Sequence, residues 1–187
     1  MSIDVIQIVK ELIETIDKNA LKKKVKKLKY SNPGLTQEDL CDAIIHDEAL
    51  FCGIVGAGAY ILPGPFSWLM CAPDIINFLA KQGKVILSIA YVFGHDPSSE
   101  ERIIEILACL GFTSGIVAGQ EQMKQMIIAG LKSGFVKEIA RNIGIVLSKK
   151  AINSFIPFIG SVTGGIFNYI GILSVGRAAV SYYSTKR

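Results

Sequence analysis

The chain has 187 residues, of which 50% are hydrophobic and 19% are charged, and its formal net charge is +4. This length suits one domain with a substantial core and excludes two domains of ordinary size. Because an average soluble domain carries about 25% charged residues, the low charge predicts extensive burial, either inside a helical bundle or against lipid.

The first predicted element is an amphipathic helix over residues 3–29. Its apolar residues keep the i, i+3, i+4, i+7 spacing of one helix face, and they are Ile6, Val9, Ile13, Ile16 and Ala20. The end of this helix carries a lysine cluster, which consists of Lys22, Lys23, Lys24, Lys26, Lys27 and Lys29. Residues 32–34 (Asn-Pro-Gly) break the helix, because Pro fixes φ and Gly tolerates positive φ. We therefore expect residues 1–31 to form an N-terminal element before a helical domain over residues 36–184.

The N-terminal segment does not predict a signal peptide. A signal peptide needs an unbroken apolar region, whereas acidic side chains interrupt this one at Asp4, Glu11, Glu14 and Asp17. The expected location is therefore the reducing cytosol. The four cysteines contain no CxxC pair, so we expect reduced, mostly buried thiols and no zinc site at Cys41, Cys52, Cys71 and Cys109.

A second helix is expected from residue 36 to about Leu62. Thr36 followed by Asp39 resembles a capping box, with Asp at the third helical position. Residues 49–73 contain no charge, a run long enough by count to suggest a membrane span. The Pro-Gly-Pro sequence at 63–65 divides this run, and neither half is long enough to cross a bilayer.

A third helix is expected from Pro73 to Gly94, since Pro is favoured at a helix start and Gly at a helix end. The next helix, over about residues 98–118, has two competing caps. One is Asp96 before a proline, and the other is a capping box of Ser98 with Glu101.

Further helical segments fit residues 121–133 and 136–150. Residues 151–176 are again uncharged and contain five glycines, which are Gly160, Gly164, Gly165, Gly171 and Gly176. The signals for strands are weak, since there are no Asn-Gly hairpins and no clean alternating runs. The predicted fold is all-α, a compact bundle of about six to eight helices with glycine-rich, closely packed hairpins.

Small residues recur every four positions in several of these helices. The runs are Ala49, Gly53 and Ala57; Gly111, Gly115 and Gly119; Gly130 and Gly134; and Gly160 and Gly164. Each interior Gly costs about 1 kcal/mol relative to Ala, so a packing reason is expected, either a membrane-type glycine zipper or tight packing inside a soluble bundle. The predicted helix-packing residues are Gly53, Gly111, Gly115, Gly119, Gly160 and Gly164, and we expect Gly115 to face another helix at close range.

Three groups of residues together resemble the EcsC family. The first is a Pro73-Asp74 helix start with Ile89-Ala90, then Phe93-Gly94-His95-Asp96 and Glu100-Glu101-Arg102. The others are the small-residue run from Gly53 to Ala59 and a C-terminal stretch that contains Ile156-Pro157-Phe158-Ile159-Gly160, Gly164-Gly165, Asn168 and Gly176-Arg177-Ala178. The resemblance covers about residues 36–184, with Phe93 where the family usually has Tyr. It implies an all-helical bacterial protein near a membrane, because the family takes its name from an operon that encodes a transporter linked to secretion.

Charge is unevenly distributed along the chain. Residues 1–120 hold 11 basic and 14 acidic side chains, whereas residues 121–187 hold nine basic and two acidic ones. A basic, acid-poor C-terminal third suits an anionic partner, above all a membrane surface. The predicted membrane- or anion-binding residues are the six lysines of the cluster together with Lys149 and Lys150.

Neither histidine belongs to a recognisable catalytic motif. His46 and His95 are each followed by Asp, but no Asp follows Asp96, so the order needed for an HD-type metal hydrolase is absent. A metal site improvised from His46, Asp47, His95 and Asp96 stays open as an alternative. Nucleophile elbows and Walker sequences are absent as well, so we expect no catalytic residue, no cofactor and no metal.

Asp74 and Asp96 flank one predicted helix of about twenty residues. At about 1.5 Å per residue its ends lie roughly 30 Å apart, so these carboxylates cannot act as a pair and helix capping is their expected role.

The sequence therefore predicts a non-enzymatic helical protein at the cytoplasmic side of a membrane. It is expected to bind lipid or to assist a membrane transport or secretion complex. The expected partner is an anionic membrane surface or a membrane protein, nucleic acid is not expected, and homo-oligomerisation stays open. The alternative is a hydrolase-like enzyme that uses Asp74, His95 or Asp96.

Overall fold

A computed structural model describes residues 11–59, 67–113 and 160–186. These residues form five helices: α2 (Lys18–Ser31), α3 (Gln37–Ala59), α4 (Ser67–Val92), α5 (Glu101–Thr113) and α8 (Gly160–Tyr183). Residues 11–15 are also helical, and no strand occurs in the described ranges. The predicted all-α fold is confirmed.

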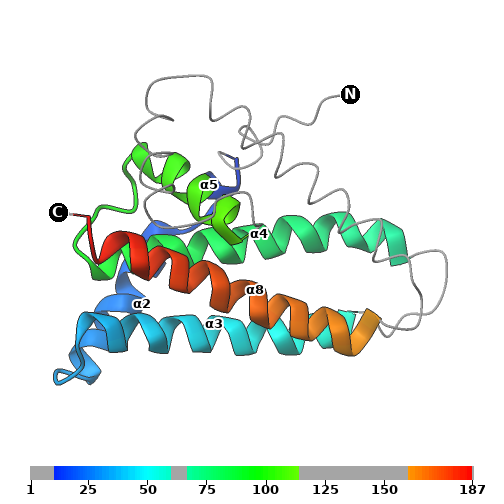
Figure 1. The fold of residues 1–187 in the computed structure, drawn as a ribbon, viewed down its shortest axis with the longest axis horizontal. Coiled ribbons are helices and arrows are strands. Elements are labelled where there is room, and N and C mark those ends of the chain that lie inside the picture. The colour runs from blue at the N-terminus through cyan, green and yellow to red at the C-terminus, as the bar shows by residue number, and fades with distance from the viewer. Residues whose placement is uncertain (1–10, 60–66, 114–159, 187) are drawn as a thin grey trace.

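Three long helices form the body of the bundle. α3, α4 and α8 run side by side, and each contacts the other two (Figure 1). α5 packs on α8 and α4, and α2 packs on α4. Among the described residues, no helix is long and apolar enough to cross a bilayer.

The prediction of one continuous helix over residues 3–29 is wrong in one respect, because the helix is interrupted at Ile16 and Asp17. The Asp17 carboxylate accepts hydrogen bonds from the backbone N–H groups of Asn19 at 3.0 Å and Ala20 at 2.9 Å. Asp is more favourable at an N-cap than inside a helix, because its carboxylate accepts hydrogen bonds from the first backbone N–H groups, which have no carbonyl partner within the helix. The N-terminal segment therefore contains two helical pieces.

The predicted start of α3 is confirmed. Thr36 Oγ1 accepts the Asp39 backbone N–H at 3.1 Å, and Asp39 Oδ2 accepts the Thr36 backbone N–H at 3.0 Å. This reciprocal pair is the capping box expected from the sequence.

The expected start of the third helix at Pro73 is wrong, because α4 begins six residues earlier at Ser67. The intervening residues include Leu, Met and Ala, which are strong helix formers, and they extend the helix on the N-terminal side of the proline. The predicted end is confirmed: Gly94 has φ +89°, and the N–H groups of Gly94 and His95 bond to the carbonyls of Tyr91 and Ala90. This pattern is a Schellman motif, which requires the left-handed conformation that Gly adopts without strain.

Neither of the two proposed caps starts α5, which begins at Glu101, about three residues later than expected. The Asp96 carboxylate accepts the Ser98 backbone N–H at 3.2 Å and so stabilises a turn before the helix. Asp side chains commonly close such local turns in competition with helix caps.

The tightest contacts at described glycines lie on α8. A Cβ atom at Gly176 would lie 2.5 Å from the Ile45 side chain of α3, and one at Gly171 would lie 2.6 Å from Phe78 of α4. At Gly53, a predicted packing residue, an added Cβ would lie 3.5 Å from Tyr169 of α8, an ordinary contact. The other predicted packing glycines, Gly111, Gly115, Gly119, Gly160 and Gly164, lie outside the residues whose side chains the structure describes.

Three of the four cysteines support the expected reduced state. Cys41, Cys52 and Cys109 are buried and free, and burial is the main cause that raises the pKa of Cys41 to about 12. The side chain of Cys71 lies outside the described residues.

Candidate functional site: a buried polar cluster and an exposed lysine face

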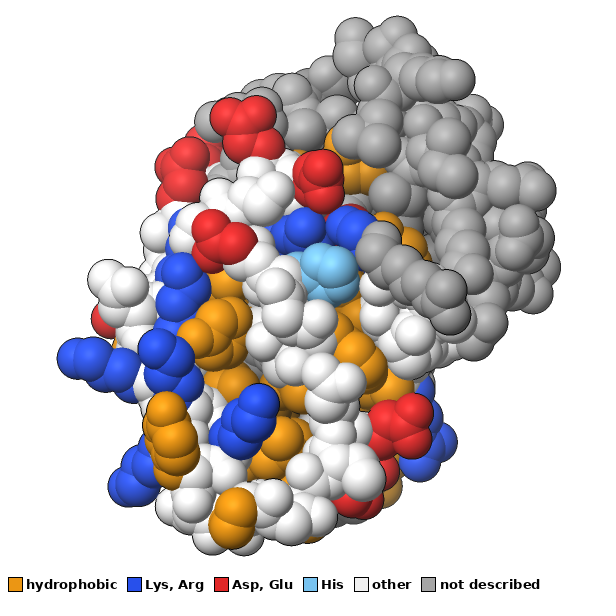
Figure 2. Space-filling view, turned by 90° about the vertical axis from the view of Figure 1, so that its left-hand side faces the viewer, with side chains coloured by type: hydrophobic (Ala, Val, Ile, Leu, Met, Phe, Trp, Pro, Cys, Tyr) orange, Lys and Arg blue, Asp and Glu red, His pale blue; other side chains and the backbone are white. Residues whose placement is uncertain are grey.

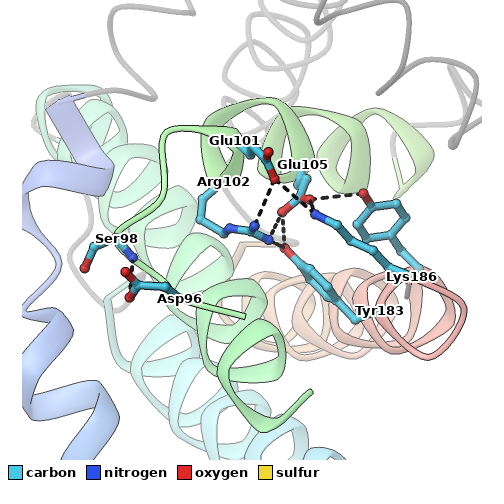
Figure 3. Close-up of polar contacts among 8 residues, drawn as sticks. Asp96, Ser98, Glu101, Arg102, Glu105, Tyr183 and Lys186 are labelled. Atoms are coloured by element: carbon cyan, nitrogen blue, oxygen red, sulfur yellow. Dashed lines mark hydrogen bonds and ion pairs between the residues drawn. The ribbon is translucent and has the colours of Figure 1, made fainter. Parts of the chain in front are cut away.

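A buried carboxylate lies where α5 meets the end of α8. Glu105 is only 1% exposed and accepts hydrogen bonds from Tyr183 at 2.6 Å and from Tyr182 at 3.0 Å. Arg102 and Lys186 form ion pairs with the same carboxylate (Figure 3). We call these five residues the polar cluster.

The chain builds the polar cluster from two short sequence segments. Arg102 and Glu105 are three residues apart on α5, so they share a helix face. Tyr182, Tyr183 and Lys186 come from the last turn of α8 and the residues after it. The cluster thus joins segments about eighty positions apart in the chain and ties α5 to α8.

Each oxygen of Glu105 receives two donors. Oε1 faces Tyr182 and Lys186, and Oε2 faces Arg102 and Tyr183. A carboxylate oxygen offers about two lone pairs, so Glu105 has no acceptor site left for a substrate proton. Burial, followed by the charge of Glu105, raises the pKa of both tyrosines, which therefore stay protonated as donors. This arrangement supports a structural role rather than acid–base catalysis.

His95 lies at the edge of the polar cluster. Its ring centroid is 5.3 Å from that of Tyr183, and its buried Nε2 has no hydrogen-bond partner among the described residues. Burial, followed by the nearby charges of Lys186 and Arg102, lowers the pKa of His95 below its ordinary value of 6.5. The imidazole is therefore neutral at pH 7.

The lysine cluster of the sequence divides into two groups. Lys22 pairs with Asp96 at 3.0 Å, and Lys24 pairs with Asp47 at 2.6 Å and with Glu48 at 3.1 Å. These two lysines hold α2 against the rest of the bundle. The remaining four are exposed and have no carboxylate partner among the described residues: Lys23, Lys26, Lys27 and Lys29.

Three of the exposed lysines share one face of α2 with an aromatic residue. Lys23, Lys26, Lys27 and Tyr30 follow the i, i+3, i+4, i+7 spacing, and Tyr30 is 81% exposed. We call these four residues the lysine face. Leu35, in the turn between α2 and α3, is also exposed, at 40%. This end of the molecule faces the viewer in Figure 2, where blue side chains flank isolated hydrophobic ones.

Two of the candidate hydrolase residues, His95 and Asp96, face different partners in the structure. Asp96 faces Lys22 on α2, whose hydrogen bond is the main cause that lowers the pKa of Asp96, whereas His95 faces Tyr183 of α8. The side chain of Asp74, like Lys149 and Lys150, lies outside the described residues.

The improvised metal site is not assembled either. Asp47 is held by Lys24, and Asp96 is held by Lys22. In the described part of the chain, no three His, Cys, Asp or Glu side chains are grouped so that they could hold a metal ion.

The polar cluster is not among the sites predicted from the sequence. A signal for it was present, since Arg102 and Glu105 lie three residues apart within the apolar run that follows Glu101 in α5. Two charges on the apolar face of a helix indicate a buried, paired site. Their partners at 182–186 could not be identified without the packing of α5 on α8.

Comparison with protein families found a match to the EcsC protein family over residues 4–187. The chain belongs to the EcsC family. The match includes α2, which lies before the segment 36–184 to which the motifs pointed. Comparisons with curated proteins and with solved structures found no match.

Proposed function

We propose that this EcsC protein is a non-enzymatic, peripheral protein that binds the anionic surface of a membrane through the lysine face of α2. The observation that carries the proposal is the exposed stripe of Lys23, Lys26, Lys27 and Tyr30 beside the exposed Leu35. Lysines attract anionic headgroups, and Tyr favours the headgroup level because its ring is apolar and its hydroxyl is polar.

The packing of α2 supports this orientation. Leu21 and Val25 are buried on the opposite side of the helix, and Lys22 and Lys24 hold it to Asp96, Asp47 and Glu48. The lysine face therefore points away from the bundle, and no rearrangement of α2 is needed for membrane contact.

The expected affinity of this face alone is low. Each lysine near an anionic leaflet contributes about 1 kcal/mol, so three contribute about 3 kcal/mol, which corresponds to millimolar-scale binding. Insertion of Tyr30 and Leu35 adds apolar burial, and the basic C-terminal third adds further attraction. We propose the cytoplasmic leaflet as the target and a role as accessory to a transport or secretion complex, in line with the family context.

The test is co-sedimentation of the purified protein with phosphatidylglycerol-containing vesicles and with pure phosphatidylcholine vesicles, at low and high salt. The parent is expected to bind only the anionic vesicles and to dissociate in high salt. A Lys26→Gln/Lys27→Gln variant should bind less. The matched control is Lys18→Gln/Arg177→Gln, which also removes two positive charges but none from the lysine face, and it should retain more vesicle binding than the Lys26→Gln/Lys27→Gln variant.

Two outcomes would contradict the proposal. The first is that the parent binds neither kind of vesicle. The second is that both double variants lose the same fraction of binding, because net charge rather than the lysine face would then be responsible.

A further inference from the structure

A groove lies between α2 and α4, on residues that the lysine face does not share. Its volume is about 510 Å³, within the range of about 300–1,000 Å³ typical of small-molecule sites. Its described lining includes the apolar residues Ile16, Ala20 and Ala80 and three lysines, Lys24, Lys81 and Lys84, which we call the lysine rim.

The three lysines of the groove differ in their partners. Lys84 donates to Glu48 at 2.6 Å, and Lys24 donates to the same carboxylate at 3.1 Å. Lys81 has no carboxylate partner among the described residues, and its Nζ lies 4.6 Å from the centre of the Phe51 ring. Lys81 is therefore the ammonium group that is available to an anionic ligand, whereas the charges of Lys24 and Lys84 are balanced by Asp47 and Glu48.

The acidic lining residue does not oppose such a ligand directly. The Asp17 carboxylate is directed at the backbone N–H groups of its own helix, which it caps. Glu48 is buried behind Lys24 and Lys84 and is bound to both. Since Asp47 and Glu48 balance Lys24 and Lys84, Lys81 is the lysine of the lining that an anionic headgroup would meet.

The hydrophobic side of the groove is formed by Ile16, Ala20 and Ala80. A neighbouring apolar pocket shares Ile16 and Ala80 with the groove, but its volume of about 10 Å³ is too small for an acyl chain. An apolar chain would therefore lie within the groove, against these three side chains. Together with the lysine rim, this indicates an amphiphile with one apolar chain and one anionic head.

We propose that the groove binds the carboxylate form of a single-chain fatty acid, with the head at Lys81 and the acyl chain along Ile16, Ala20 and Ala80. This site is independent of membrane binding by the lysine face. A single chain suits a groove of this volume, whereas a two-chain phospholipid would leave its second chain against the lysine rim.

The experiment is a fluorescence titration of the purified full-length protein with cis-parinaric acid, a fatty acid whose emission rises in an apolar site. The parent should show saturable binding. Lys81→Gln should weaken it about tenfold, the loss of one charge-assisted contact. Ala20→Trp should abolish binding by filling the groove, and its far-UV circular dichroism should match the parent because Ala20 is exposed.

Two controls separate this site from the lysine face. Lys26→Gln/Lys27→Gln should bind parinaric acid like the parent even where it loses vesicle binding. The uncharged alcohol of the same chain should bind more weakly than the acid and should not respond to Lys81→Gln.

The proposal is overturned if the parent shows no saturable binding or if Lys81→Gln binds the acid like the parent. It is also overturned if the acid and the alcohol bind equally well, since the lysine rim would then recognise nothing. Displacement of the probe by phosphatidylglycerol vesicles but not by oleate would assign the groove to a bilayer lipid instead.

Discussion

Gly176→Ala probes the closest approach of α3 and α8. The new Cβ would lie 2.5 Å, 2.7 Å and 3.0 Å from three side-chain carbons of Ile45, which is 2% exposed. Carbon atoms in good contact are about 3.5–4.0 Å apart, so the two helices must separate or Ile45 must leave its rotamer. Overpacking of this kind lowers the free energy of unfolding by about 1–3 kcal/mol, and the higher helix propensity of Ala offsets up to about 1 kcal/mol of that loss. We expect a net destabilisation of about 1–2 kcal/mol.

The assay is urea denaturation followed by far-UV circular dichroism, in which the midpoint should fall while the slope stays unchanged. Gly83→Ala is the matched control, because its added Cβ would lie 3.4 Å from Ile16, an ordinary contact. This control should be neutral or stabilised by up to about 1 kcal/mol. The double variant Ile45→Ala/Gly176→Ala should lose less free energy of unfolding than the two single variants lose together, because the smaller side chain relieves the clash. Equal midpoints for Gly176→Ala and the parent would refute the reasoning.

Three further predictions concern buried charges and a histidine. Glu105→Ala leaves the buried Arg102 without its main partner and should cost about 3–5 kcal/mol in urea denaturation, whereas an equal midpoint would contradict the pairing. As the pH falls, His95 takes up a proton in the unfolded chain before it does so in the folded protein, because folding lowers its pKa. The contribution of neutral His95 to the free energy of unfolding is therefore complete above about pH 6.5 and declines below it. His95→Gln should flatten the decline in the free energy of unfolding between about pH 7 and pH 5. Glu48→Ala leaves Lys84 and Lys24 without their shared acceptor and should lower the thermal midpoint more than the exposed control Glu14→Ala.

The ends of several helices were predictable because local chemistry determines them. The capping box at Thr36 and Asp39 and the left-handed turn at Gly94 involve residues close in sequence, and both form as expected. Where two local caps competed before α5, at Asp96 and at Ser98 with Glu101, neither begins the helix. The cap at Asp17 was not predicted, because the apolar spacing continued through it.

The sequence also identified the six lysines at the end of α2 as one cluster of candidates for membrane or anion binding. It could not predict which of these lysines would instead form ion pairs within the protein. Lys22 and Lys24 pair with Asp96 and Asp47, which belong to distant segments, so their role depends on how α2 packs against the bundle.

Sequence alone thus determined the all-α class, the N-terminal cap of α3, the C-terminal cap of α4 and the lysine-rich end of α2, because each depends on residues within a few positions of one another. Only the tertiary structure decided that Gly176 meets Ile45 and that Glu105 collects donors from the end of α8. It also decided that α2 and α4 enclose a groove. The physical reason is that the register and separation of packed helices arise from many weak contacts between side chains far apart in the chain, and no local pattern records them.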